Sequence, residues 1–232
     1  MNPKDHLLLL HGAIGAADQL KPLAAELGKD FTIHTLDFSG HGGKPFPDGP
    51  YAISLFAEDV LAYIDSLGLD KMAIFGYSMG GYVGMWLALH HPVRVHKLVT
   101  LATKFHWDPD IARRETQMIN PQKILEKVPA FARALEQRHQ PNSWKIVLER
   151  TAAMLTDLGE RPPLSPGACK TITVPTLLLL GDSDKMVSLE ETQAVYESIP
   201  GARLEILPGT PHPIEQVDVI MLGDRLRYFY KG

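Results

Sequence analysis

The sequence contains a single cysteine, Cys169, among its 232 residues. One thiol cannot form a disulfide within the chain, so the fold cannot depend on such a bond. A single cysteine also cannot form a metal site made of several thiolates, and the sequence has no spaced cluster of histidines and carboxylates that could bind a metal instead. We therefore expect no metal, no organic cofactor and a cytoplasmic location.

The chain also lacks a strong excess of either charge and any long apolar run. Its formal net charge is −4, and no block of basic residues stands out. Nucleic acids and membranes are therefore poor candidate partners, and a small-molecule substrate is expected instead. The apolar run near the N-terminus, residues 7–10, is too short for a signal peptide or a membrane span. The oligomeric state is left open.

The composition is that of an ordinary globular domain, with 45% hydrophobic and 22% charged residues. Short apolar segments typical of buried parallel strands alternate with amphipathic segments that are typical of helices. Ser54 and Ser188 are placed to cap two of these helices, and Pro213 to open the last one. The alternation predicts an α/β fold with a doubly wound, mostly parallel sheet. The expected strands are residues 6–10, 31–36, 72–75, 98–102, 176–180 and 203–207.

The pattern changes after the fourth expected strand, because residues 104–167 contain no convincing strand. Asp108-Pro109 and Asn120-Pro121 mark helix starts there, and Val128-Pro129 is expected to break the middle helix. We therefore predict an α/β core made of residues 1–103 and 168–232. Residues 104–167 are predicted to form a small helical cap inserted into that core.

A G-x-S-x-G motif, Gly76-Tyr77-Ser78-Met79-Gly80, stands between an expected strand and an expected helix. A sharp strand-to-helix turn strains the backbone of Ser78 and lifts its hydroxyl clear of the sheet. Gly76 and Gly80 are expected to keep the turn free of clashing side chains. The motif therefore predicts Ser78 as a nucleophile.

A serine nucleophile needs a base that a third group orients. His212 follows the last expected strand, so its loop can fold over the sheet toward Ser78. Asp182 and Asp184, after the fifth strand, are the near candidates for the orienting acid, and Asp108 is a remote one. All of them lie at carboxyl ends of strands, where parallel sheets carry their sites.

The tetrahedral intermediate of acyl transfer carries a negative oxygen that needs fixed donors. The backbone N–H of Met79 lies at a helix N-terminus and is one expected donor. The other is expected from the His11-Gly12-Ala13 loop, as the N–H of Ala13. His11 itself is expected to order that loop by hydrogen bonds, and Asp37 to bind loop N–H groups.

These motifs together resemble the α/β-hydrolase superfamily over nearly the whole chain. The matching residues are His11-Gly12, Asp37-x-x-Gly40-His41-Gly42, the motif around Ser78, Gly181-x-x-Asp184 and His212. The aspartate of G-x-x-D is usually the triad acid in that family, so the resemblance favours Asp184. It also implies that the helical insertion is a lid.

The expected lid offers large apolar side chains that would exclude water and receive an acyl or aryl group. Candidate substrate-binding residues are Trp107, Met118, Trp144 and Met154. The alternative is that each of them packs the lid helices together. Arg113, Arg114 and Lys145 could meet a substrate carboxylate, although solvated helix faces explain them better.

The sequence thus predicts a serine hydrolase that cleaves a carboxylic ester or thioester of a small, largely apolar substrate through an acyl-enzyme intermediate. A carbon–carbon bond hydrolase, an acyltransferase or a perhydrolase of the same fold would look much the same. A hydrolase-fold ligand receptor or signalling partner with little turnover is a further alternative. Tyr82 stands where related enzymes of menaquinone synthesis usually have arginine, which argues against that reaction. Ser78 argues against dehalogenases and epoxide hydrolases of this fold, whose nucleophile is aspartate.

Overall fold

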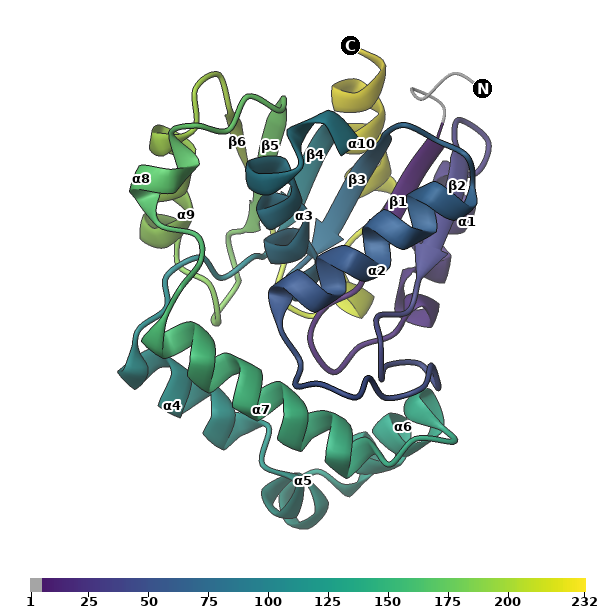
Figure 1. The fold of residues 1–232 in the computed structure, drawn as a ribbon, viewed down its shortest axis with the longest axis vertical. Coiled ribbons are helices and arrows are strands. Elements are labelled where there is room, and N and C mark those ends of the chain that lie inside the picture. The colour runs from purple at the N-terminus through teal and green to yellow at the C-terminus, as the bar shows by residue number, and fades with distance from the viewer. Residues whose placement is uncertain (1–5) are drawn as a thin grey trace.

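Six parallel strands form the centre of the protein in a computed structural model that describes residues 6–232 (Figure 1). The strands are β1 (His6–Leu10), β2 (Thr32–Leu36), β3 (Met72–Tyr77), β4 (Val95–Leu101), β5 (Thr176–Gly181) and β6 (Arg203–Leu207). Their order in the sheet is β2-β1-β3-β4-β5-β6, and every neighbouring pair is parallel. The predicted doubly wound sheet is therefore confirmed. The strand order reverses between β1 and β3, where open α/β sheets bind their ligands.

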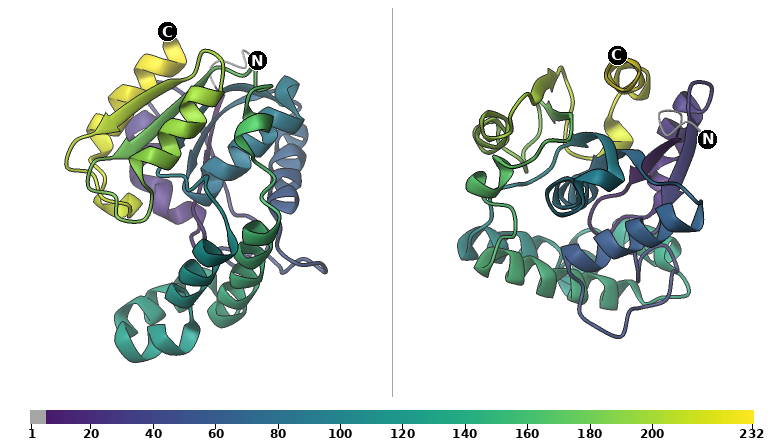
Figure 2. Two further views of the ribbon diagram at one scale, coloured as in Figure 1. Left: turned by 90° about the vertical axis from the view of Figure 1, so that its left-hand side faces the viewer. Right: turned by 45° about the horizontal axis from the view of Figure 1, so that its top comes forward.

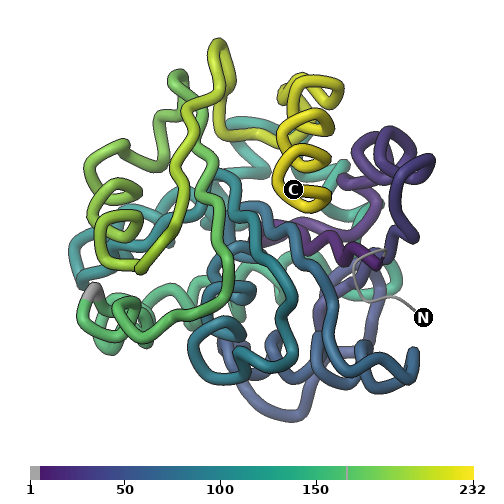
Figure 3. The backbone as a smooth tube through the Cα atoms, turned by 90° about the horizontal axis from the view of Figure 1, so that it is seen from above, coloured from purple at the N-terminus to yellow at the C-terminus, as the bar shows by residue number. Residues whose placement is uncertain are grey.

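Helices cover both faces of this sheet because alternate side chains of the strands point in opposite directions. Leu7 and Leu9 of β1 pack with α1 (Lys21–Leu27) and α10 (Val219–Lys231), which lie side by side in Figure 3. Leu8 and Leu10 pack against the opposite layer. That layer consists of α2 (Ile53–Ser66), α3 (Met79–His90) and α9 (Leu189–Ser198). Short 3-10 helices η2 (Ala17–Leu20), η3 (Pro92–Arg94) and η4 (Ile214–Gln216) complete the connections.

The helical insertion leaves the sheet after β4 and returns before β5. It contains α4 (Pro109–Met118), α5 (Pro121–Lys127), α6 (Pro129–His139), α7 (Trp144–Glu160) and the start of the short α8 (Pro166–Cys169). The insertion crosses the end of the sheet toward which β3 points, and α5 lies farthest from the sheet (Figure 1). Figure 2, left, shows the teal and green helices of the insertion below the sheet. Asp108 and Asn120 cap α4 and α5 by accepting hydrogen bonds from the backbone, as their sequence positions predict.

Two helix starts differ from the sequence pattern. Ser188 caps α9 as predicted, with its hydroxyl accepting from Glu191 N, whereas the prediction that Ser54 caps a helix is wrong. Helix α2 begins one residue earlier, at the buried Ile53, because this apolar side chain belongs to the helix face that packs on the core. Pro213 precedes only η4, and α10 begins later, where Asp218 accepts from two backbone N–H groups.

The structure bears on the start of the predicted core and on membrane-spanning segments only for the residues that it describes. The predicted core begins at residue 1, but residues 1–5 lie outside the described part of the chain. Within residues 6–232, no helix combines the length and the apolar character that crossing a membrane requires.

Candidate active site

Ser78 occupies a strained turn between β3 and α3. Its φ of 52° and ψ of −116° lie in a region that residues with a Cβ rarely adopt. A Cβ added to Gly76 would lie 2.4 Å from the backbone of Gly80, and one added to Gly80 would lie 2.5 Å from Leu10 O. The tight crossing of β3, α3 and the end of β1 therefore requires glycine at both positions, as the motif predicts.

His212, in the loop after β6, contacts a carboxylate from the loop after β5. Its Nδ1 lies 2.8 Å from Oδ2 of Asp184, whose side chain is fully buried, while that of His212 is 12% exposed. Because a carboxylate accepts, His212 Nδ1 carries the hydrogen, which leaves Nε2 free to accept a proton. The Tyr77 hydroxyl donates to the backbone carbonyl of His212 at 3.0 Å and steadies the loop.

The two candidate acids have different environments. Oδ1 of Asp184 accepts from Met186 N at 2.7 Å and from Val187 N at 2.9 Å. Burial alone would raise the pKa of Asp184, but the hydrogen bond from His212 and these two amides outweigh burial and hold the pKa below its ordinary value. Asp182 instead binds Ser183 Oγ and Thr210 N, and thus stabilises the turn itself.

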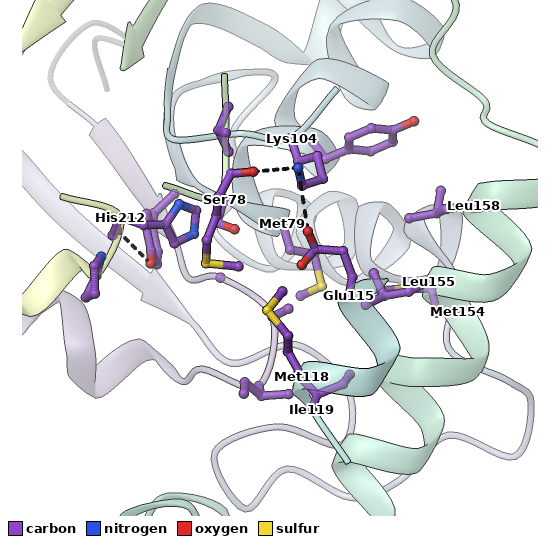
Figure 4. A pocket seen from close by; sticks show the side chains of 18 of the residues that line it. Ser78, Met79, Lys104, Glu115, Met118, Ile119, Met154, Leu155, Leu158 and His212 are labelled. Atoms are coloured by element: carbon purple, nitrogen blue, oxygen red, sulfur yellow. Dashed lines mark hydrogen bonds and ion pairs between the residues drawn. The ribbon is translucent and has the colours of Figure 1, made fainter. Parts of the chain in front are cut away.

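A cavity of about 380 Å³ opens beside these residues, between the sheet and the helical insertion. Ser78, His212, Ala13 and Met79 all line it. Figure 4 shows Ser78 and His212 at one side of the cavity and Leu158 of α7 at the other. The cavity therefore joins the predicted nucleophile, base and oxyanion donors in one space that is large enough for a small organic molecule.

The β1 loop, residues 11–15, holds Ala13 at the rim of the cavity. Phe38 N donates to Nε2 of the fully buried His11, so Nδ1 of this ring carries the hydrogen and donates to Gly12 O at 2.8 Å. Burial lowers the pKa of His11 to about 4 and keeps the ring neutral at pH 7. Since Gly12 C=O and Ala13 N–H belong to one planar peptide, fixing the carbonyl also fixes the direction of the N–H. His11 thus orders its loop by hydrogen bonds, as predicted.

Asp37 accepts a hydrogen bond from a backbone N–H group, as the sequence predicts. Its Oδ1 accepts from Ala17 N at 2.7 Å, at the start of η2. Burial raises the pKa of Asp37, which this hydrogen bond opposes. The carboxylate faces the backbone, and it does not line the cavity.

Three of the four side chains predicted to bind substrate, Trp107, Met118 and Met154, line the cavity. Trp144 does not, and this expectation is corrected. Its buried indole packs within the insertion, in a cluster with Ile124, Ala132, Leu135 and Leu148. The remaining apolar lining from the insertion comes from Ile119, Phe131, Leu155 and Leu158.

The cations of the cavity are also not those suggested by the sequence. Among the described residues, Lys104 and Arg138 line it, whereas Arg113, Arg114 and Lys145 do not. Both lining cations are paired. Lys104 Nζ donates to Met186 O at 2.5 Å and lies 3.6 Å from Glu115 Oε1, and Arg138 Nη2 lies 3.6 Å from Glu215 Oε1. Nothing in the local sequence distinguishes them from solvated charges, because their partners are distant along the chain.

The described residues contain no group of three or more histidine, cysteine, aspartate or glutamate side chains that could hold a metal ion. The polar groups around Ser78 can instead transfer protons and stabilise an anion. This arrangement of a hydroxyl, an imidazole and a carboxylate is suited to acyl transfer.

A family model described as the alpha/beta hydrolase fold matches residues 5–150, more than half of the chain. The chain belongs to the α/β-hydrolase family. Among similar proteins, 3-oxoadipate enol-lactonase 2 from Acinetobacter baylyi is 26% identical over 74% of this chain and 68% of its own length. Pimeloyl-[acyl-carrier protein] methyl ester esterase from Edwardsiella ictaluri is 25% identical over 90% of this chain and 86% of its own.

Solved structures agree with this assignment of the α/β-hydrolase fold. The 2-hydroxy-6-oxo-6-phenylhexa-2,4-dienoate hydrolase from Rhodococcus sp. strain RHA1 superposes with a TM-score of 0.82, covering all of this chain and 92% of its own. Its sequence is only 19% identical, so this likeness concerns the fold alone.

Proposed function

We propose that this α/β hydrolase cleaves a carboxylic ester or thioester of a small, largely apolar substrate, with Ser78 as nucleophile, His212 as base and Asp184 as the residue that orients His212. The observation that carries the proposal is the 2.8 Å contact between His212 Nδ1 and Asp184, at a cavity that Ser78 also lines. This contact selects the tautomer of His212 whose Nε2 can take a proton from a hydroxyl.

The reaction would follow the usual course of acyl transfer. Ser78 Oγ attacks the carbonyl carbon as His212 takes its proton, and the N–H groups of Ala13 and Met79 stabilise the oxyanion. His212 then returns the proton to the leaving alcohol or thiol. Water, deprotonated by His212, attacks the acyl-enzyme; the bond to Ser78 Oγ breaks, His212 returns the proton to Oγ, and the acid is released. No metal or organic cofactor takes part in these steps.

The substrate class is supported by the cavity and by the relatives. Apolar side chains of the helical insertion face Ser78, and they suit an acyl or aryl group. Because Lys104 and Arg138 are paired with carboxylates, the cavity has no large excess of charge. The named relatives include an enol-lactonase and a methyl ester esterase, both of which act on ester bonds. The single cysteine remains the ground for a cytoplasmic location.

A series of p-nitrophenyl esters of increasing acyl length tests the proposal with the wild type and with Ser78→Ala. We expect turnover by the wild type and a loss in kcat of about 10⁴-fold or more in the variant. A fluorophosphonate probe should label the wild type at Ser78 and leave the variant unlabelled. Activity of Ser78→Ala near that of the wild type would refute Ser78 as the nucleophile.

Carbon–carbon hydrolysis is the second candidate, because the same nucleophile, base and oxyanion donors around this cavity could act at a ketone next to a carbon–carbon bond. It would appear as turnover of a vinylogous 1,5-diketone that exceeds turnover of every ester in the series. A wild type that is labelled by the probe but turns over neither class would favour the receptor alternative.

A further inference from the structure

The last residue of α6, His139, joins the helical insertion to two loops of the core. Its side chain is fully buried. Nε2 lies 3.0 Å from the carbonyl oxygen of Ile14 in the β1 loop, and Gly42 N donates to Nδ1 at 3.2 Å. One ring therefore bridges the loop that carries Ala13, the loop after β2 and the insertion.

The hydrogen-bond partners determine the tautomer of this ring. A backbone N–H can only donate, so Nδ1 of His139 must accept from Gly42 and Nε2 must carry the hydrogen. Nε2–H then donates to the carbonyl of Ile14. The bond from Gly42 requires a neutral ring, because Nδ1 of a protonated imidazole carries a hydrogen and cannot accept. Burial is the main cause that lowers the pKa of His139 to about 4, and the neighbouring Arg138 also opposes the charge.

Ile14 needs such support because its backbone is strained. Its φ is 52°, in the left-handed region that a β-branched residue rarely adopts. A conformation of this kind is unfavourable and persists only where the surroundings hold it. His139 donates to the Ile14 carbonyl, and Arg138 Nη1 adds a longer contact of 3.4 Å.

The carbonyls on either side of Ala13 are thus held from different parts of the molecule. Gly12 O accepts from two groups of the β1 loop itself, Gly15 N and the buried ring of His11. Ile14 O accepts from His139 and Arg138 in the insertion. The position of the Ala13 N–H depends on both ends of this short segment, and one of those ends is attached to α6.

We propose that His139 is a positioning residue, which couples the seating of the helical insertion to the geometry of the oxyanion hole. The inference rests on the proposed function, and in particular on the role of Ala13 N–H. With the insertion seated, the imidazole fixes the strained Ile14 and with it the donor at Ala13. With that bond broken, Ile14 can relax, and Ala13 N–H is displaced from the position that suits the oxyanion although the Gly12 carbonyl stays held.

His139→Leu tests this role by removing both hydrogen bonds while retaining an apolar side chain. We expect kcat for a short-chain ester to fall about 10- to 100-fold with little change in KM, since loss of one oxyanion donor costs at least this much. His139→Gln offers one donor and one acceptor and should recover most of the rate. Where His139→Leu does not fold, His139→Asn, which is too short to reach both partners, should show the same loss.

A matched control comes from another buried polar side chain of the insertion. Thr151 is fully buried, donates to Val147 O within α7 and does not line the cavity. Thr151→Val should lower Tm without changing kcat. If His139 acts only through stability, its variants will show no larger loss in kcat than Thr151→Val at equal loss of Tm, and the inference is overturned.

A pair of inhibitors distinguishes an effect on oxyanion stabilisation from an effect on substrate binding. An alkyl trifluoromethyl ketone adds to the serine as a hemiketal oxyanion, whereas the matching methyl ketone binds mainly as a ketone. The ratio of their affinities should fall in His139→Leu by about the same factor as kcat. An unchanged ratio in an active protein overturns this inference alone. A wild type that neither hydrolyses esters nor reacts with a fluorophosphonate overturns the proposed function as well.

Discussion

Replacing Asp184 by asparagine tests whether Asp184 sets the tautomer of His212, that is, which ring nitrogen carries the hydrogen. The carboxylate accepts from His212 at one oxygen and from two backbone N–H groups at the other. An asparagine side chain must place its NH₂ group at one of these sites. Facing the backbone, the NH₂ would leave two amide donors unpaired, whereas facing the imidazole it can still form a hydrogen bond once the ring changes its tautomer.

The NH₂ group introduced by Asp184→Asn should therefore turn toward His212. It would donate to Nδ1 and force the hydrogen of the imidazole onto Nε2, the atom that should accept the proton of Ser78. The base is then present in the wrong tautomer. A substitution of this type in a Ser-His-Asp triad costs about 10⁴-fold in kcat, which equals about 5.4 kcal/mol at 1.36 kcal/mol per tenfold change.

Asp182→Asn is the matched control, since Asp182 lies two residues away and accepts from Ser183 Oγ and Thr210 N through one oxygen. An amide oxygen can replace that acceptor, so we expect kcat to stay within about tenfold of the wild type. Ester hydrolysis at pH 7 to 8 measures kcat, and Tm shows that both proteins are folded. A larger loss from Asp182→Asn than from Asp184→Asn would refute the assignment of the acid.

Three further predictions concern stability. Ser78→Gly should be more stable than Ser78→Ala by about 1 kcal/mol in urea unfolding, because glycine relieves the φ of 52° and alanine does not; equal stabilities would show that the turn is unstrained. Gly76→Ala should cost about 1–3 kcal/mol, since its Cβ would meet backbone at 2.4 Å, whereas Gly49→Ala, with open space, should be nearly neutral; similar urea midpoints for the two would contradict the predicted clash. The folded pKa of His139 is near 4 and lies below the ordinary 6.5, so the unfolded chain binds this proton more readily. Its contribution to stability is complete above about pH 6.5 and is lost as pH falls toward 4, and urea midpoints for His139→Gln should therefore decline less over this range than those of the wild type.

The strands, their parallel arrangement and the turn at Ser78 could be predicted because their causes are local. Apolar runs identify buried strands, and the glycines around Ser78 reflect a steric demand within a few residues. The carboxyl-end rule then places the β1 loop, Asp184 and His212 at one edge of the sheet. Residue types at strand ends were therefore sufficient to nominate the site.

The lining of the cavity could not be predicted in the same way. Helix α7 is apolar on more than one face, so its sequence does not show which apolar side chains face the cavity. In the structure, Met154 lines the cavity and Trp144 packs within the insertion. The contact of His139 with Ile14 joins residues 125 positions apart, and no periodic pattern records it.

The amino-acid sequence by itself determined the α/β fold and the chemistry that Ser78 and His212 offer, because strand burial and a tight glycine turn depend on neighbours along the chain. Only the tertiary structure decided which carboxylate meets His212 and which side of the insertion faces the substrate. Those outcomes depend on how separate segments pack, since a hydrogen bond or a cavity wall forms between groups that approach within a few ångströms, whatever their separation along the chain.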